Sequence, residues 1–129
     1  MIERIISPNA PTPHGPYCHA VRAGDFLYIS GQAAMDPETN QQQKGTAASE
    51  TRRTLENIRA VLNTAGADFS DVVKCSVFLS DIGDFAEMNA VYAEYFGEHK
   101  PARTTVQATL PALGLKVEVD CIAYKPVAG

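Results

Sequence analysis

The chain contains no tryptophan, only three cysteines, and three histidines without metal-binding spacing. Cys18, Cys75 and Cys121 are odd in number and show no C-x-x-C spacing, so neither a disulfide framework nor a zinc site is expected. The histidines show neither H-x-x-x-H nor H-E-x-x-H spacing, and we therefore expect no metal. Cys75 and Cys121 lie in apolar runs typical of buried thiols. The reactivity of Cys18, which lies in a loop-like context, stays open.

Long apolar runs are also missing, and we expect no leader sequence. No stretch approaches the roughly 18 apolar residues of a membrane span, and residues 1–4 lack the basic-then-apolar layout of a signal peptide. We therefore expect a cytoplasmic protein with no membrane partner. The chain has 11 Lys and Arg against 15 Asp and Glu, for a net charge of −4, and it shows no basic stripe. Because nucleic-acid binders carry such a stripe, no nucleic acid is expected as the main partner.

What the chain does contain is the composition of an ordinary globular domain. Its 129 residues, 45% hydrophobic and 20% charged, predict a single domain spanning 1–129. Apolar residues at spacings of three and four predict helices over 46–65 and 85–96. Alternation and branched residues predict strands over 2–6, 17–23, 26–30, 71–79, 104–107 and 116–124.

Local signals refine these elements. Gly66 is expected as a left-handed cap after the first helix, and Asp84-x-x-Glu87 resembles a capping box before the second. Gly31-Gln32 is expected to interrupt the third strand. In the fourth strand, alternation places Val73 with the apolar residues of one face.

The resulting order, β-β-β-α-β-α-β-β, predicts an α+β two-layer sandwich. Its mixed sheet would carry two helices on one face. The other face of the sheet would then need cover, which predicts assembly of several chains.

Arg103 is the first candidate for chemistry. It follows Pro101 at the mouth of a strand, where period 2 places Arg103, Thr105 and Gln107 on one face. The planar guanidinium suits a carboxylate or phosphate held by two parallel hydrogen bonds. A solvated arginine or a structural ion pair is the alternative.

Glu118 is the second candidate, because it lies on a strand whose opposite face is apolar. A carboxylate there can orient or deprotonate a water, although a solvent-facing charge is the commoner fate. Two loops add weaker signals, Gly15-Pro16-Tyr17 and Ser30-Gly31-Gln32, the second of which lets a ligand approach the backbone closely. No G-x-S-x-G, Walker or dinucleotide motif supports a nucleophilic hydrolase or nucleotide binder.

Taken together, the motifs are specific and cover nearly the whole chain. They are Gly15-Pro16-Tyr17, Ile29-Ser30-Gly31-Gln32, Thr54-Leu55-x-Asn57-Ile58, Asp71-Val72-Val73-Lys74, Val77-Phe78-Leu79-x-Asp81-Ile82-x-Asp84-Phe85, Asn89-x-x-Tyr92 and Pro101-Ala102-Arg103. In this order they resemble the reactive-intermediate deaminase family, RidA, also called YjgF.

The resemblance implies a chorismate-mutase-like α+β fold and a homotrimer with sites at the subunit interfaces. It implies hydrolysis of small 2-imino acids, such as 2-iminobutanoate and 2-iminopropanoate, to 2-oxo acids and ammonia, without metal or cofactor. These imines leave pyridoxal-phosphate enzymes such as threonine dehydratase.

The resemblance also assigns roles to residues. Arg103 would bind the substrate carboxylate and Glu118 would activate the attacking water. Tyr17 would close the pocket. The remaining substrate-binding positions implied by the resemblance are Ser30, Gly31, Asn89 and Thr105.

Several departures from the family pattern leave the particular imine and the partner enzyme open. Thr105 stands where many members have Cys, although the family role there uses the backbone carbonyl. The loop 98–100 is short, with Lys100 in place of an aromatic residue, and the segment 112–115 lacks its usual charges. Two alternatives follow: a pathway-specific deaminase for an aminomuconate-like enamine, and a non-catalytic metabolite-binding or chaperone-like trimer. Ribonuclease or translation-inhibitor activity, reported for relatives, is disfavoured by the acidic charge.

Overall fold

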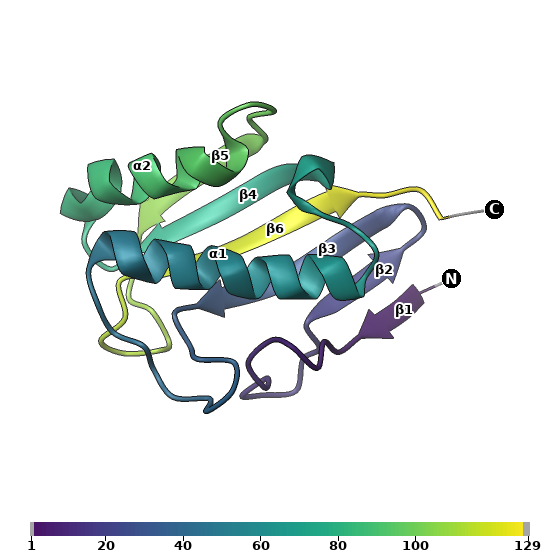
Figure 1. The fold of residues 1–129 in the computed structure, drawn as a ribbon, viewed down its shortest axis with the longest axis horizontal. Coiled ribbons are helices and arrows are strands. Elements are labelled where there is room, and N and C mark those ends of the chain that lie inside the picture. The colour runs from purple at the N-terminus through teal and green to yellow at the C-terminus, as the bar shows by residue number, and fades with distance from the viewer. Residues whose placement is uncertain (1, 128–129) are drawn as a thin grey trace.

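In the computed structural model, which describes residues 2–127, two helices pack on one face of a six-stranded sheet (Figure 1). The helices are α1, Ala47–Thr64, and α2, Phe85–Phe96. Two short 3-10 turns, Phe69–Asp71 and Ile82–Asp84, precede β4 and α2. The strands are β1 Ile2–Ile5, β2 Ala20–Ala23, β3 Phe26–Ala33, β4 Val72–Leu79, β5 Ala102–Gln107 and β6 Val117–Tyr124.

The sheet is mixed, with the strand order β1-β2-β3-β6-β4-β5. All neighbouring pairs are antiparallel except β4 and β5, which are parallel because α2 crosses between them. The expected element order and the α+β class are therefore confirmed. β5 forms one edge of the sheet.

The core lies between the sheet and the helices, which cover the same face (Figure 1). Leu55, Ile58 and Leu62 recur along α1 at the spacing of one helical face and are fully buried. Thr46 caps α1 by accepting a hydrogen bond from the Ser49 amide. Gly66, at φ +82°, adopts the left-handed conformation predicted after this helix.

The expected interruption of the third strand at Gly31-Gln32 is wrong. β3 continues to Ala33, and the change of register there is a bulge between Ile29 and Gln32 in its pairing with β6. The expected second strand, in contrast, starts late. β2 begins at Ala20 rather than residue 17, so Tyr17 belongs to the preceding loop.

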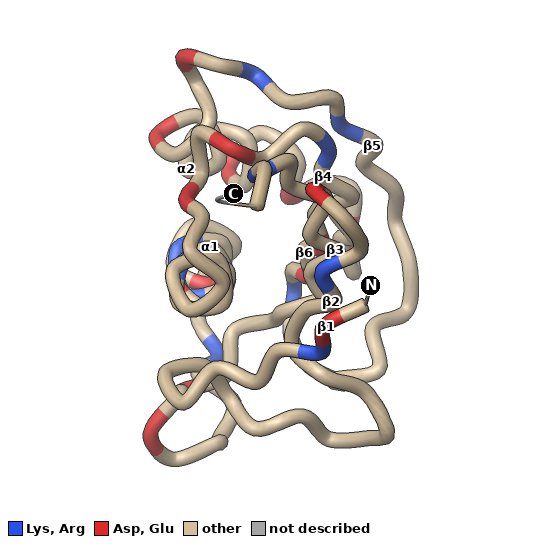
Figure 2. The backbone as a smooth tube through the Cα atoms, turned by 90° about the vertical axis from the view of Figure 1, so that its right-hand side faces the viewer, with Lys and Arg blue, Asp and Glu red and all other residues tan. Residues whose placement is uncertain are grey.

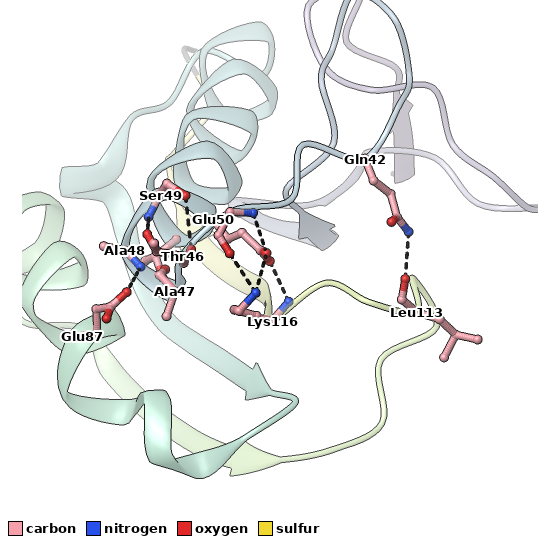
Figure 3. A network of polar contacts seen from close by, with 11 residues as sticks. Gln42, Thr46, Ala47, Ala48, Ser49, Glu50, Glu87, Leu113 and Lys116 are labelled. Carbon is pink, nitrogen blue, oxygen red and sulfur yellow. Dashed lines mark hydrogen bonds and ion pairs between the residues drawn. The ribbon is translucent and has the colours of Figure 1, made fainter.

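Two other local predictions are also wrong. Asp84 makes no capping hydrogen bond, and the Glu87 carboxylate instead accepts from the Ala48 amide at the start of α1, at 2.7 Å (Figure 3). Val73 is 43% exposed, whereas Val72 is buried, because the β4–β6 register shifts between Val72 and Lys74. A bulge reverses which side chains reach the core.

The face of the sheet away from the helices carries exposed apolar side chains. Phe26 on β3 and Tyr124 on β6 pack edge to face, with ring centroids 5.1 Å apart, and Tyr28 lies on the same face. Phe26, Tyr28 and Tyr124 are each at least 40% exposed in the single chain. Within residues 2–127, no helix is long and apolar enough to cross a membrane.

Candidate active site

A pocket of about 650 Å³ opens beside β3 and β6. Its walls come from the proline-rich loop before β2, the bulge of β3, the loop after it and the segment before β6. Four residues expected in the site line it: Tyr17, Ser30, Gly31 and Glu118. The other lining residues are Pro11, Thr12, Pro13, His14, His19, Gln32, Ala33, Met35, Gln42, Pro111 and Ala112.

Glu118 lies half-buried on the face of β6 that points away from the helices. A Cβ added to Gly31 would lie 2.6 Å from Glu118 Oε2, so only glycine leaves room for this carboxylate. The described residues donate no hydrogen bond to the Glu118 carboxylate. Burial, and secondarily the charge of Asp120, raise its pKa above the ordinary value. A group with these properties can act as a base.

The proline-rich loop is held in place by a histidine to which the sequence assigned no role. His19 is buried, its Nδ1 accepting from the Ser7 amide at 2.8 Å and its Nε2 donating to the Pro11 carbonyl at 2.6 Å. The Ser30 hydroxyl donates to the Cys18 carbonyl at 2.7 Å. Ser30 therefore lines the pocket while its hydroxyl holds the loop.

Tyr17 lies at the mouth of this pocket. Its ring is 48% exposed, and its hydroxyl accepts from the His14 amide at 3.2 Å. A fixed loop therefore carries an exposed phenol beside Glu118.

The opposite wall is fixed by Glu50, a fully buried carboxylate at the start of α1 (Figure 3). Its Oε1 accepts from the Lys116 amide at 2.6 Å and its Oε2 from the Gly45 amide at 3.2 Å. The Lys116 ammonium lies 3.7 Å from Oε2 and donates to the Gly45 carbonyl at 2.8 Å. Gln42 also donates to the Leu113 carbonyl. This network joins the segment before α1 to the segment that enters β6, two residues before Glu118.

We expect Glu50→Ala to lower the free energy of unfolding by about 3 kcal/mol, because it leaves two partly buried amides without their acceptor and removes the ion-pair partner of Lys116. Urea unfolding followed by circular dichroism measures this change. Glu94→Ala is the matched control, since Glu94 pairs with Arg52 on the exposed surface and should leave the midpoint nearly unchanged. Equal urea midpoints for Glu50→Ala and Glu94→Ala would contradict a stabilising role of the Glu50 network.

A second cluster surrounds Arg103 on β5. The Arg103 guanidinium carbon lies 4.6 Å from the ring centroid of Tyr92 and 5.5 Å from that of Phe85, both on α2. Asn89 lies between them on the same side of that helix. Among the described residues Arg103 has no hydrogen bond and no ion pair, so a structural ion pair does not occupy it. The Thr105 hydroxyl, two residues further, is also buried without a partner.

The two clusters lie on opposite faces of the sheet. Arg103 is the register partner of Cys75, whose side chain is in the core beneath the helices. Glu118 pairs with Phe78 instead and alternates with buried Val117 and Val119. A single chain therefore brings Glu118 together with Tyr17, Ser30 and Gly31. It does not bring them together with Arg103, Asn89 and Thr105.

Charge and metal-binding groups are otherwise dispersed. Basic and acidic residues are scattered along the tube in Figure 2, and the segment from Thr104 to Leu115 carries no charged residue. Within the described residues 2–127, no group of three His, Cys, Asp or Glu side chains is placed to hold a metal ion.

The fold and the clusters around Arg103 and Glu118 together characterise the protein. It is a two-layer α+β chain with an unpaired arginine on one sheet face and a pocket carboxylate on the other. The model of the family described as endoribonuclease L-PSP matches residues 7–125. The chain belongs to this family, which includes the RidA, YjgF and RutC proteins, and the resemblance noted in the sequence is confirmed.

Individual relatives match over almost their full lengths. A RutC family protein of Pyrococcus horikoshii is 50% identical, over 97% of this chain and 99% of its own. The human 2-iminobutanoate/2-iminopropanoate deaminase is 40% identical, over 97% and 92%. The crystal structure of Escherichia coli TdcF with bound serine is 35% identical, with a TM-score of 0.87 over 95% and 98% of the two chains.

Proposed function

We propose that the protein hydrolyses reactive 2-imino acids, such as 2-iminobutanoate and 2-iminopropanoate, to 2-oxo acids and ammonia. The proposal rests chiefly on Arg103, a half-buried guanidinium that has no acid partner among the described residues and so suits an external carboxylate. Family membership and the human deaminase relative support the same chemistry. No cofactor takes part in the proposed reaction.

In the proposed reaction, Arg103 binds the substrate carboxylate through two parallel hydrogen bonds. This places the neighbouring imine carbon beside a water held by Glu118. The Glu118 carboxylate removes a proton from that water as its oxygen attacks the carbon of the protonated imine, giving a neutral carbinolamine. The protonated Glu118 then returns this proton to the nitrogen. The carbon–nitrogen bond breaks as the Glu118 carboxylate takes the hydroxyl proton, so a 2-oxo acid forms and the departing ammonia takes up that proton as ammonium.

The separation of the two clusters supports assembly of several chains. Because Arg103 and Glu118 lie on opposite faces of the sheet, one active site needs Arg103, Asn89 and Thr105 from one chain and Glu118 with Tyr17 from its neighbour. The exposed apolar face around Phe26, Tyr28 and Tyr124 supplies a surface to bury between chains. We propose a homotrimer with sites at its interfaces, acting in the cytoplasm.

The direct test generates 2-iminobutanoate with a threonine dehydratase and follows its conversion to 2-oxobutanoate with and without the protein. The expected result is faster release of 2-oxobutanoate in proportion to protein concentration. An inert wild-type protein would contradict the proposal. Activity on aminomuconate-like enamines would then indicate a pathway-specific deaminase, and binding of 2-oxobutanoate without turnover would indicate a metabolite-binding trimer.

A complementation experiment tests the shared site. Arg103→Ala and Glu118→Gln chains, each inactive alone, are co-expressed with different tags, and the mixed assemblies are purified through both tags. If each site takes Arg103 from one chain and Glu118 from another, every mixed trimer has one intact site, so about one third of the sites in the purified assemblies should be active. Mixed assemblies without activity would show that both residues must come from the same chain.

Gly31→Ala is expected to lower kcat about tenfold, because its Cβ would displace the Glu118 carboxylate from its position. Thermal unfolding should still show a folded protein, since the displaced atoms end a flexible side chain. Kinetics with 2-iminobutanoate measure the effect. An unchanged kcat would mean that Glu118 does not act from the position seen here.

Asp120→Asn is expected to extend activity to lower pH. Glu118 acts as a base only when ionised, so the rate falls as the pH drops through its raised pKa. The negative charge of Asp120 contributes to that raised pKa, and removing it lowers the pKa of Glu118. The pH profile of kcat measures the shift, and an acid limb that stays in place or moves to higher pH would contradict it.

A further inference from the structure

Arg103 is held by aromatic rings rather than by acids. Its guanidinium carbon lies 4.6 Å from the Tyr92 ring centroid and 5.5 Å from that of Phe85. A cation over an aromatic face within about 6 Å is attracted by the ring, and most strongly when it is desolvated. Unlike a carboxylate, a ring leaves the N–H donors of the guanidinium free for a ligand.

Tyr92 is itself fixed in place. Only 7% of it is exposed, and its ring packs against Phe96 one turn along α2, with centroids 4.6 Å apart. The Tyr92 hydroxyl is buried beside the Cys75 thiol without a hydrogen bond of good geometry, and burial raises the pKa of the phenol. The buried Tyr92 hydroxyl therefore donates no hydrogen bond to the described residues. Arg103 contacts the face of the Tyr92 ring.

We infer that Tyr92, with Phe85 beside it, is a positioning residue that holds the Arg103 guanidinium in the orientation a carboxylate ligand requires. This inference rests on the proposed role of Arg103 as the carboxylate-binding group. Without these rings, no hydrogen bond or ion pair with the described residues would restrict the long Arg103 side chain, and each ligand would have to order it on binding.

The orientation of Arg103 can be observed without any ligand. The Arg103 Nε–H resonance, assigned by its disappearance in Arg103→Lys, should be shifted upfield by the ring currents in the wild type. Tyr92→Phe keeps the ring and should keep this shift, whereas Tyr92→Leu should move the resonance toward the position of a free arginine, because only the Phe85 ring remains. A wild-type resonance at the free-arginine position would overturn the inference, as would one that Tyr92→Leu leaves in place.

The effect on a ligand is measured with 2-oxobutanoate, the proposed product, by calorimetric or NMR titration. Tyr92→Leu should raise its Kd about tenfold, and Tyr92→Phe should stay within about twofold of wild type. Val91→Ala is the matched control, because it removes a buried side chain from the same helix without removing a ring that packs on Arg103 or Tyr92. It should lower the melting temperature and leave Kd unchanged.

The outcomes separate the two claims. If the wild type binds 2-oxobutanoate and Tyr92→Leu binds it equally well, the positioning role is wrong and the proposed function stands. If Tyr92→Phe weakens binding as much as Tyr92→Leu, the hydroxyl acts rather than the ring, which also overturns the inference. If the wild type binds no 2-oxobutanoate, the carboxylate-binding role of Arg103 fails, and the inference fails with it.

Discussion

Arg103→Ala is expected to lower kcat/KM for 2-iminobutanoate about a thousandfold, since it removes two charge-assisted hydrogen bonds worth about 1.5–3 kcal/mol each. The protein should still fold, because Arg103 forms no ion pair or hydrogen bond with the described residues. The measurement is the coupled assay, together with size-exclusion chromatography to show that the assembly is intact.

Arg103→Lys is the matched variant for this prediction. It keeps the charge but loses the planar fork that two parallel hydrogen bonds require, so it should recover only part of the lost activity. Recovery to the wild-type rate would mean that charge alone suffices. An Arg103→Ala variant with wild-type kcat/KM would remove the arginine from the mechanism altogether.

Glu118→Gln is expected to lower kcat about a thousandfold while leaving the Kd for 2-oxobutanoate within about threefold. The amide keeps the size of the side chain but cannot take a proton from water. The kinetic assay and a product titration on the same preparation separate the two quantities. If kcat falls little, the attacking water is activated by another group.

Glu118→Gln, which should lower activity, is expected to raise stability. The folded-state pKa of Glu118 is raised, so the ionised form is less stable in the folded protein than in the unfolded one. Below the unfolded pKa the group is neutral in both states, and the cost grows as pH rises through the folded pKa. Glu118→Gln should therefore unfold at a higher urea concentration than wild type at pH 7. An advantage that is larger at acid pH would contradict this sign.

Much of the architecture could be predicted because it depends on periodicity. The stripe through Leu55 and Ile58, and the alternation around Val117 and Val119, report directly which side faces the core. The family resemblance likewise implied roles for Arg103 and Glu118, which the structure places in two different clusters.

What the sequence could not supply is geometry that depends on distant contacts. The bulge at Gly31 and the shift at Val72 each arise from pairing with β6, so local alternation misses them. Asp84 and Glu87 have the spacing of a capping box, but the Glu87 carboxylate accepts a hydrogen bond from the Ala48 amide of α1 instead. No sequence motif predicts the roles of Glu50 and His19, because the Lys116 amide that binds Glu50 is remote in the chain and the partners of His19 are backbone groups of an irregular loop.

The placement of Arg103 and Glu118 on opposite sheet faces has a genetic consequence under the proposed trimer. In a trimer with two wild-type chains, a chain defective only at Arg103 would inactivate one site, as would a chain defective only at Glu118. A chain carrying both defects would spoil two sites at once while folding normally. Expressed beside the wild type, such a double variant is therefore a dominant inhibitor, and two singly defective alleles would partly rescue each other.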